Sequence, residues 1–184
     1  MMRKIIVLLL TYLLPVGIVS AGNFAITSPQ VKNGGFIVNE QVFNGFGCQG
    51  SNISPTLRWK NAPAGTKSFA VTVYDPDAPT GSGWWHWVVF DIPANVTSLI
   101  KDAGNPLAGH APAGSIQSRT DFGKPGYGGP CPPAGDKAHR YQFTVYALKT
   151  EKLSLDEHAP AAMVGFYLHQ NLIDKAVFEA RYGR

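Results

Sequence analysis

The chain has 184 residues and a formal net charge of +4 at pH 7, from 16 lysines and arginines against 12 aspartates and glutamates. This length suits one ordinary domain with a substantial core, and the basic residues form no cluster of the kind that binds nucleic acid. We therefore expect a single domain with no nucleic-acid partner.

A secretory leader is predicted over residues 1–21, to be cleaved. Arg3 and Lys4 precede an apolar run, Ile5 to Leu14, and Val19-Ser20-Ala21 offers small residues for cleavage. Cleavage would leave residues 22–184 as a single domain in the periplasm or outside the cell. The alternative is a retained N-terminal anchor. The run is shorter than the roughly 20 apolar residues of a permanent membrane span, and no later segment approaches that length.

Segments of strand length, rich in Val, Phe, Tyr and Trp, recur along the chain. In chain order the predicted strands are Phe24–Thr27, Thr56–Trp59, Ser68–Tyr74, Trp85–Ile92, Arg140–Leu148 and Ala176–Tyr182. The run Trp85–Ile92 has almost no polar alternation, which predicts a strand inside a sheet with both faces covered. A strand-dominated chain without regular helical crossovers favours an antiparallel sandwich.

One segment, residues 160–173, has apolar residues near helical spacing and predicts a helix near the C-terminus. Ser154 and Glu157, just upstream, fit the spacing of a capping box. No other segment has a convincing helical pattern.

The region 103–136 is rich in glycine and proline and predicts a long irregular loop. Loops of this length are uncommon in compact domains unless they are functional or disordered. Cys48 and Cys131 lie outside the predicted leader, and a pair of cysteines in an exported chain tends to oxidise. We therefore predict a disulfide that ties down an ordered, site-forming loop, with two free buried thiols as the alternative.

Acid, imidazole and phenol groups stand at the ends of three predicted strands. Asp75 ends one strand and opens the stiff turn Asp75–Pro79, His86 begins the next strand, and His139 and Tyr141 begin the third on one face. If the three ends converge, one pocket holds all four side chains. Taken singly, His86 and the tryptophans around it are more often core residues.

Five motifs share one resemblance. They are DPDAP (75–79), WWHWVVFDIP (84–93), GPCPPAGDKAHRYQFTVYAL (129–148), NISPTLRW (52–59) and SRTDFGKPGYGG (118–129). Their types and order resemble the phosphatidylethanolamine-binding protein family, and the last two point to its bacterial, Raf-kinase-inhibitor-like branch. The resemblance covers nearly all of residues 22–184.

The resemblance implies an antiparallel Greek-key β-sandwich with a few peripheral helices, one near the C-terminus, and a small pocket for phosphate-like anions. Carried over by position, the ligand-binding residues are Asp75, His86, His139 and Tyr141, with Asp77, Pro79, Trp87, Pro132 and Pro133 near the rim. It also makes the Ala78–Pro79 peptide a candidate for the cis form. Cys131 is a departure, because the better-studied eukaryotic members have a glycine there whose backbone meets the anion. We expect the disulfide to shape the pocket mouth instead.

The leading hypothesis is an exported binding protein for a phosphate-like or phospholipid head-group ligand, without a catalytic residue, cofactor or metal. Two imidazoles and a phenol can donate hydrogen bonds to an anion. We expect Asp75 to fix the tautomer of one imidazole, or else to meet the ammonium end of an ethanolamine-like head group. Trp84, Trp85 and Trp87 are expected to wall the pocket and lower its dielectric.

Two other classes of function stay open. One is an inhibitor or signalling partner of a periplasmic, secreted or host protein, since the family resemblance extends to kinase and protease inhibitors. The other, ranked last, is an enzyme in which His86, His139 and a carboxylate bind a metal or act as an acid/base pair. The sequence has no G-x-S-x-G elbow, H-E-x-x-H helix or Walker A loop to support hydrolysis or nucleotide turnover.

Overall fold

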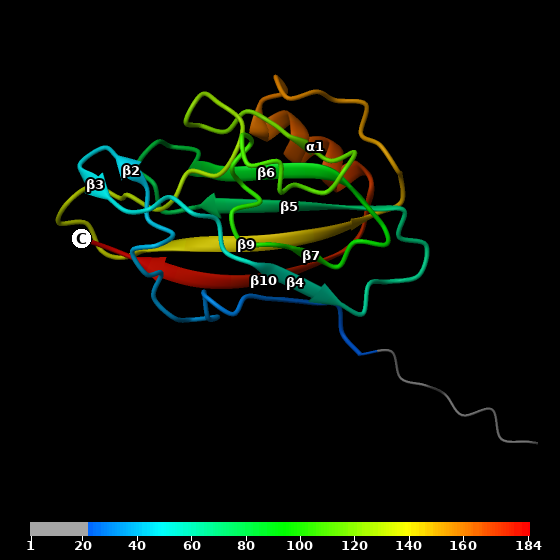
Figure 1. Ribbon diagram of the computed structural model, residues 1–184, viewed down its shortest axis with the longest axis horizontal. Coiled ribbons are helices and arrows are strands. Elements are labelled where there is room, and N and C mark those ends of the chain that lie inside the picture. The colour runs from blue at the N-terminus through cyan, green and yellow to red at the C-terminus, as the bar shows by residue number, and fades with distance from the viewer. Residues whose placement is uncertain (1–21) are drawn as a thin grey trace, which may run out of the picture.

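A computed structural model describes residues 22–184, and the predicted leader lies outside the described residues (Figure 1). Strands dominate it, as the runs of β-branched and aromatic residues predict. The elements are β1 (Ala25–Thr27), β2 (Asn44–Gly45), β3 (Cys48–Gln49), β4 (Leu57–Lys60), β5 (Ser68–Asp75), β6 (Trp84–Pro93), β7 (Ser98–Leu99), β8 (Ile116–Gln117), β9 (His139–Leu148), α1 (Ala161–Gln170) and β10 (Leu172–Tyr182).

The four long strands and β8 form one antiparallel sheet in the order β10-β9-β5-β6-β8. Strand β6 lies between β5 and β8 and is buried over most of its length, as its unbroken apolar run predicts. The register sets Val73 of β5 opposite Trp87 of β6 and Phe143 of β9. All six predicted strands are present, five of them with ends within one residue of the prediction.

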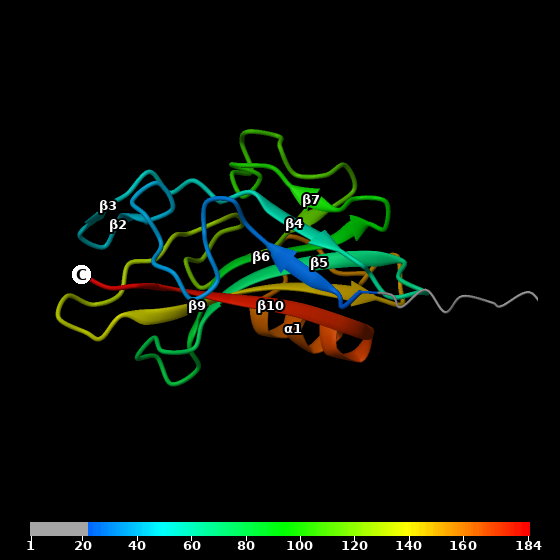
Figure 2. The ribbon, with the colours of Figure 1, turned by 90° about the horizontal axis from the view of Figure 1, so that it is seen from below.

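Three layers are visible when the molecule is viewed along the sheet (Figure 2). A smaller sheet, β1-β4-β7, covers one face of the large sheet, and α1 covers the other. Between the sheets, Leu57 and Trp59 pack in one cluster with Phe69 and Phe143. Each such fully buried side chain contributes about 1.5–3 kcal/mol through the hydrophobic effect. The predicted fold class, an antiparallel β-sandwich with a helix near the C-terminus, is confirmed.

The helix α1 closes the second cluster, in which its Val164 and Leu168 meet Val88 and Phe90 of β6. Val88 and Phe90 belong to this cluster while Val89 belongs to the cluster between the sheets, so the alternation of β6 supplies both layers. The helix ends earlier than predicted, and β10 begins at Leu172 rather than at residue 176.

Two local predictions are wrong. The described residues contain no cis peptide, so Ala78–Pro79 is trans. The turn closes in that form, since the Thr80 amide donates to the Ala78 carbonyl at 2.8 Å. The capping box is also absent, because α1 begins after Pro160 and has no side-chain cap. Ser154 and Glu157 therefore lie too far upstream to reach the first turn.

No helix within residues 22–184 has the length and apolar character that crossing a membrane requires.

Candidate ligand-binding site

Three strand ends meet at one end of the large sheet, near β2, β3 and the C-terminus (Figure 1). Strand β5 ends at Asp75, opposite Trp84 at the start of β6, and β9 begins at His139 beside them. Antiparallel pairing brings these ends together, because a strand that finishes at one end of the sheet has neighbouring strands that start at that end. The structure therefore brings together the four residues that the sequence singles out.

A pocket of about 210 Å³ opens at this point. Its lining consists of Phe46, Asp75, Ala78, Pro79, Thr80, Trp84, His86, Phe122, Cys131, Pro132, Pro133, His139 and Tyr141. The acid, the imidazoles and the phenol come from the strand ends, and Thr80 comes from the turn between β5 and β6. The aromatic and proline walls come mostly from loops. The pocket thus joins a few fixed polar groups to an apolar wall, as small-molecule sites usually do.

The carboxylate of Asp75 holds the ring of His139. His139 Nδ1 lies 2.8 Å from Asp75 Oδ2, and both side chains are about 5% exposed or less. The other oxygen of Asp75 accepts the Asp77 amide at 2.8 Å, which fixes the carboxylate. Because the Nδ1 proton is directed at the carboxylate, His139 Nε2 is left for other partners, and the nearest acid is Asp136, 3.6 Å away.

His86 is held by backbone instead of by an acid. Its Nδ1 donates to the carbonyl of Gly128 at 2.6 Å, and burial lowers the pKa of the imidazole. A carbonyl only accepts, so the neutral ring carries its proton on Nδ1. His86 Nε2 is then an acceptor in the neutral ring and becomes a donor only after protonation.

Tyr141 is the least satisfied polar group of the pocket. It is fully buried, and its hydroxyl makes no hydrogen bond of normal geometry in the protein, although the Asp75 carboxylate lies near enough to act on the phenol. Its ring meets the ring of His86 edge to face, with centroids 5.1 Å apart. Burial, together with the charge of Asp75, raises the pKa of the phenol, so it stays protonated and can donate. Leaving a buried hydroxyl unpaired costs about 1–3 kcal/mol, which marks this position for a ligand acceptor.

Two of the three tryptophans do not wall the pocket. Trp87 is fully buried between the sheets and donates to Gln117 Oε1 at 2.7 Å. Trp85 packs with the α1 cluster on the opposite face. Trp84 and His86 line the pocket, so the ordinary alternation of β6 sends Trp85 to the other face. A bulge that shifts the register around His86 turns Trp87 into the cluster between the sheets. Only Trp84 lines the pocket, so the predictions for Trp85 and Trp87 are wrong.

Asp77 also lies outside the pocket lining, although the sequence places it near the rim. It forms a forked ion pair with Arg140, with Oδ1 2.7 Å from Nη2 and Oδ2 2.9 Å from Nε, and it accepts the Arg140 amide. The guanidinium holds the pKa of Asp77 down at about 2. Asp77 therefore fastens the turn after β5 to the start of β9.

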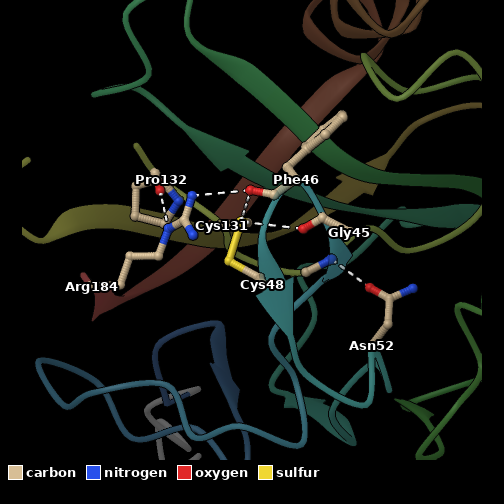
Figure 3. The surroundings of a disulfide bond; sticks show 8 residues. Gly45, Phe46, Cys48, Asn52, Cys131, Pro132 and Arg184 are labelled. Atoms are coloured by element: carbon tan, nitrogen blue, oxygen red, sulfur yellow. Dashed lines mark hydrogen bonds between the residues drawn. A yellow bond between two sulfur atoms is a disulfide. The ribbon is translucent and has the colours of Figure 1, made fainter. Parts of the chain in front are cut away.

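The predicted disulfide between Cys48 and Cys131 is present, with the Cα atoms 6.0 Å apart (Figure 3). It joins β3 to the pocket wall, because Cys131 lines the pocket next to Pro132 and Pro133. Arg184 adds a second link, since its guanidinium donates to the carbonyls of Pro132 at 2.7 Å and Phe46 at 3.0 Å (Figure 3). Sequence reasoning missed Phe46 and Phe122 in the wall, because neither stands in a periodic segment.

Within residues 22–184, no three His, Cys, Asp or Glu side chains gather closely enough to hold a metal ion. The pair of His139 and Asp75 is a hydrogen-bonded pair in a mixed polar and aromatic pocket. The chemistry that the lining can supply is hydrogen bonding from a phenol and two imidazoles, with one carboxylate beside them.

Fold and site together define a class of protein, and comparison with known families gives the same class. The protein-family model described as "PBP: Phosphatidylethanolamine-binding protein" matches residues 27–183 of this chain. The chain belongs to the phosphatidylethanolamine-binding protein family.

Its relatives include two proteins of Escherichia coli K12. UPF0098 protein YbcL is 56% identical over 156 residues, which cover 85% of each chain. UPF0098 protein YbhB is 51% identical over 155 residues, which cover 84% of this chain and 97% of YbhB. The crystal structure of E. coli YbcL, described as a new member of the mammalian PEBP family, matches with a TM-score of 0.87, 53% identity and coverage of 89% of this chain and 99% of that one.

Proposed function

We propose that the protein binds a phosphate-bearing or other anionic head group in this pocket and releases it unchanged. The observation that carries the proposal is the hydroxyl of Tyr141, which is buried, protonated and without a hydrogen bond of normal geometry at the pocket wall. A ligand oxygen that accepts from it would remove the cost of the unpaired group. Belonging to a family named for phosphatidylethanolamine binding supports the same class of ligand.

The charge arrangement favours a ligand with more than a bare anionic group. The described lining includes the carboxylate of Asp75 and no lysine or arginine. A phosphate would accept from Tyr141 and from protonated imidazoles, while the ammonium end of an ethanolamine-like group would find Asp75 or the face of Trp84. The pocket therefore suits a small zwitterion at least as well as free phosphate.

Binding without turnover is supported by the state of the possible nucleophiles. Cys131 is held in the disulfide, and the raised pKa of Tyr141 keeps the phenol from ionising. Both imidazoles have Nδ1 committed to fixed acceptors. We rank enzymatic function below binding on these grounds.

We also propose that the protein works outside the cytoplasm, in the periplasm or secreted. The predicted leader supports this location, and so does the disulfide, because disulfides persist mainly in oxidising compartments.

Calorimetric titration with inorganic phosphate and with phosphoethanolamine tests the proposal. We expect saturable binding by the wild type, and loss of about tenfold or more in affinity for His86→Ala, since hydrogen bonds to charged groups contribute about 1.5–3 kcal/mol. His158→Ala is the matched control, because His158 is exposed and does not line the pocket. Folded wild-type protein that binds neither probe would refute the proposal, and release of phosphate from phosphoethanolamine would refute binding without turnover.

A further inference from the structure

Asn52 lies outside the pocket, yet its side chain forms hydrogen bonds with the loop 127–129, which holds His86. Its Oδ1 accepts the amide of Gly129 at 2.7 Å, and its Nδ2 donates to the carbonyl of Tyr127 at 3.1 Å. Figure 3 shows Asn52 below the disulfide, with the bond that its side-chain oxygen accepts. The two bonds hold the loop on either side of Gly128.

Gly128 in turn contacts His86 with both of its peptide groups. Its amide donates to the His86 carbonyl at 2.8 Å, and its carbonyl accepts from His86 Nδ1 at 2.6 Å. A small rotation of this peptide would turn the carbonyl away from the imidazole. The orientation of the Gly128 peptide therefore decides which nitrogen of neutral His86 carries the proton.

The two glycines of the loop leave no room for side chains of their own. A Cβ atom at Gly129 would overlap the Gln41 carbonyl, and one at Gly128 would overlap the Phe122 ring. Asn52 reaches the loop from a left-handed backbone position, φ 55°, which asparagine tolerates better than most residues. The backbone N–H of Asn52 donates to the Val42 carbonyl at 2.8 Å, which fixes the direction of the side chain.

We infer that Asn52 is a positioning residue that acts through Gly128 to keep neutral His86 in the Nδ1–H form. Both halves of the amide are required, one as acceptor for Gly129 and the other as donor to Tyr127. The consequence for ligand binding rests on the proposed function. Nε2 is then the nitrogen that gains a proton when an anion binds, and the Gly128 carbonyl stabilises the imidazolium that forms, so loss of this contact would weaken anion binding.

The test is long-range ¹H–¹⁵N NMR of the imidazoles at about pH 8, where a histidine of lowered pKa is neutral. We expect the Nδ1–H form for His86 in the wild type and a mixture of tautomers in Asn52→Gly, which keeps the left-handed backbone and removes both bonds. Phosphate affinity should fall about tenfold, the lower end of the loss seen when the hydrogen-bond partner that orients a metal-ligating histidine is removed.

Asn61→Gly is the matched control. Asn61 also has a left-handed backbone, φ 57°, and its Nδ2 donates to the Asn23 carbonyl at 3.1 Å, in an exposed segment outside the pocket lining. It should retain the wild-type His86 signals and affinity. A folded Asn52→Gly variant with His86 wholly in the Nδ1–H form would overturn the inference.

Should Asn52→Gly fail to fold, Asn52→Asp carries the test. The carboxylate can still accept from Gly129 but cannot donate to Tyr127, so the Nδ1–H fraction should fall, though less far. An unchanged fraction would count against the role of Asn52. The tautomer is measured without ligand, so failure of wild-type phosphate binding would refute the proposed function and leave this test intact.

Discussion

Two buried tyrosines show how differently the same side chain is used. Burial raises the pKa of both Tyr127 and Tyr141. The hydroxyl of Tyr127 donates to the Gln41 carbonyl at 3.0 Å, whereas that of Tyr141 makes no hydrogen bond of normal geometry in the protein. The first is a structural hydrogen bond, and the second is a polar group held at the pocket wall at a cost to stability.

Phenylalanine substitutions separate these roles. Tyr141→Phe should leave the free energy of unfolding unchanged or raise it, and should weaken phosphate binding about 2- to 10-fold, because it removes only an unpaired hydroxyl. Tyr127→Phe should destabilise the protein by about 1–3 kcal/mol, since it leaves the Gln41 carbonyl buried without this donor. Urea unfolding and calorimetry check both effects. A Tyr141→Phe variant that is less stable but binds normally would contradict this assignment.

The burial of His86 predicts a pH dependence of anion binding. Burial lowers the pKa of His86, so the free protein has no proton on Nε2 at neutral pH. As the pH falls below about 6.5, protonation supplies a donor and affinity should rise. Sulfate is the suitable probe because it does not titrate in this range. Its dissociation constant should decrease from about pH 8 to about pH 5.5, with proton uptake on binding, and His86→Ala should flatten the profile. A flat wild-type profile would contradict the prediction.

At the scale of elements, the ion pair of Asp77 with Arg140 joins the turn after β5 to the start of β9. The folded pKa of Asp77 is about 2, below the ordinary value of 3.8. Its contribution to stability is therefore complete above about pH 4 and disappears as the pH falls through about 2. Both side chains are partly exposed, so the contribution is discounted for solvent screening.

Asp77→Asn should therefore lower the melting temperature at pH 6 by at most roughly 2–4 °C. The difference from wild type should shrink between about pH 4 and pH 2. Glu151→Gln, at an exposed acid outside the pocket lining, is the control and should change little. Thermal melts over this pH range check the prediction, and a difference that persists undiminished at pH 2 would contradict it.

The long strands were predictable because they are long and regular. Residues such as Val71, Val73 and Val145 favour a pleated, buried strand wherever they occur. The end of α1 was not predictable from the sequence, because the spacing of Leu172 and Ile173 suits a helix and a strand equally. Pairing settles it: Leu172 lies opposite Leu148 at the end of β9. The two-residue strands carry too little pattern to be recognised from sequence.

The four polar residues of the pocket were predictable because each stands at the end of a strand with a strong pattern. The backbone partner that orients His86 was not predictable. Gly128 acts through its backbone, and no side-chain pattern reports a carbonyl contact. The bulge at His86 turns Trp87 into the core, and a bulge depends on pairing with β5 rather than on local sequence.

Across the whole molecule, the disulfide closes a loop between positions 83 apart in sequence. Closing such a loop restricts the unfolded chain by up to about 4.5 kcal/mol in the loop-entropy model. Cys48→Ser with Cys131→Ser should therefore lower the free energy of unfolding by up to that amount and weaken phosphate binding. Reducing agent should bring the wild type to the level of the double variant in urea unfolding and leave the double variant unchanged. Equal stability of the oxidised wild type and the double variant would contradict this.

The hairpin β2–β3 belongs to neither of the packed sheets, yet its turn supplies Phe46 to the pocket. A two-stranded ribbon has little stability by itself, and this one is fastened by the disulfide and by Arg184. A wall attached at two points can change in length or composition without altering the register of the long strands. Grafting hairpins of other sizes between the disulfide and the Arg184 contact is therefore a way to change which ligands the pocket prefers while the two sheets stay unchanged.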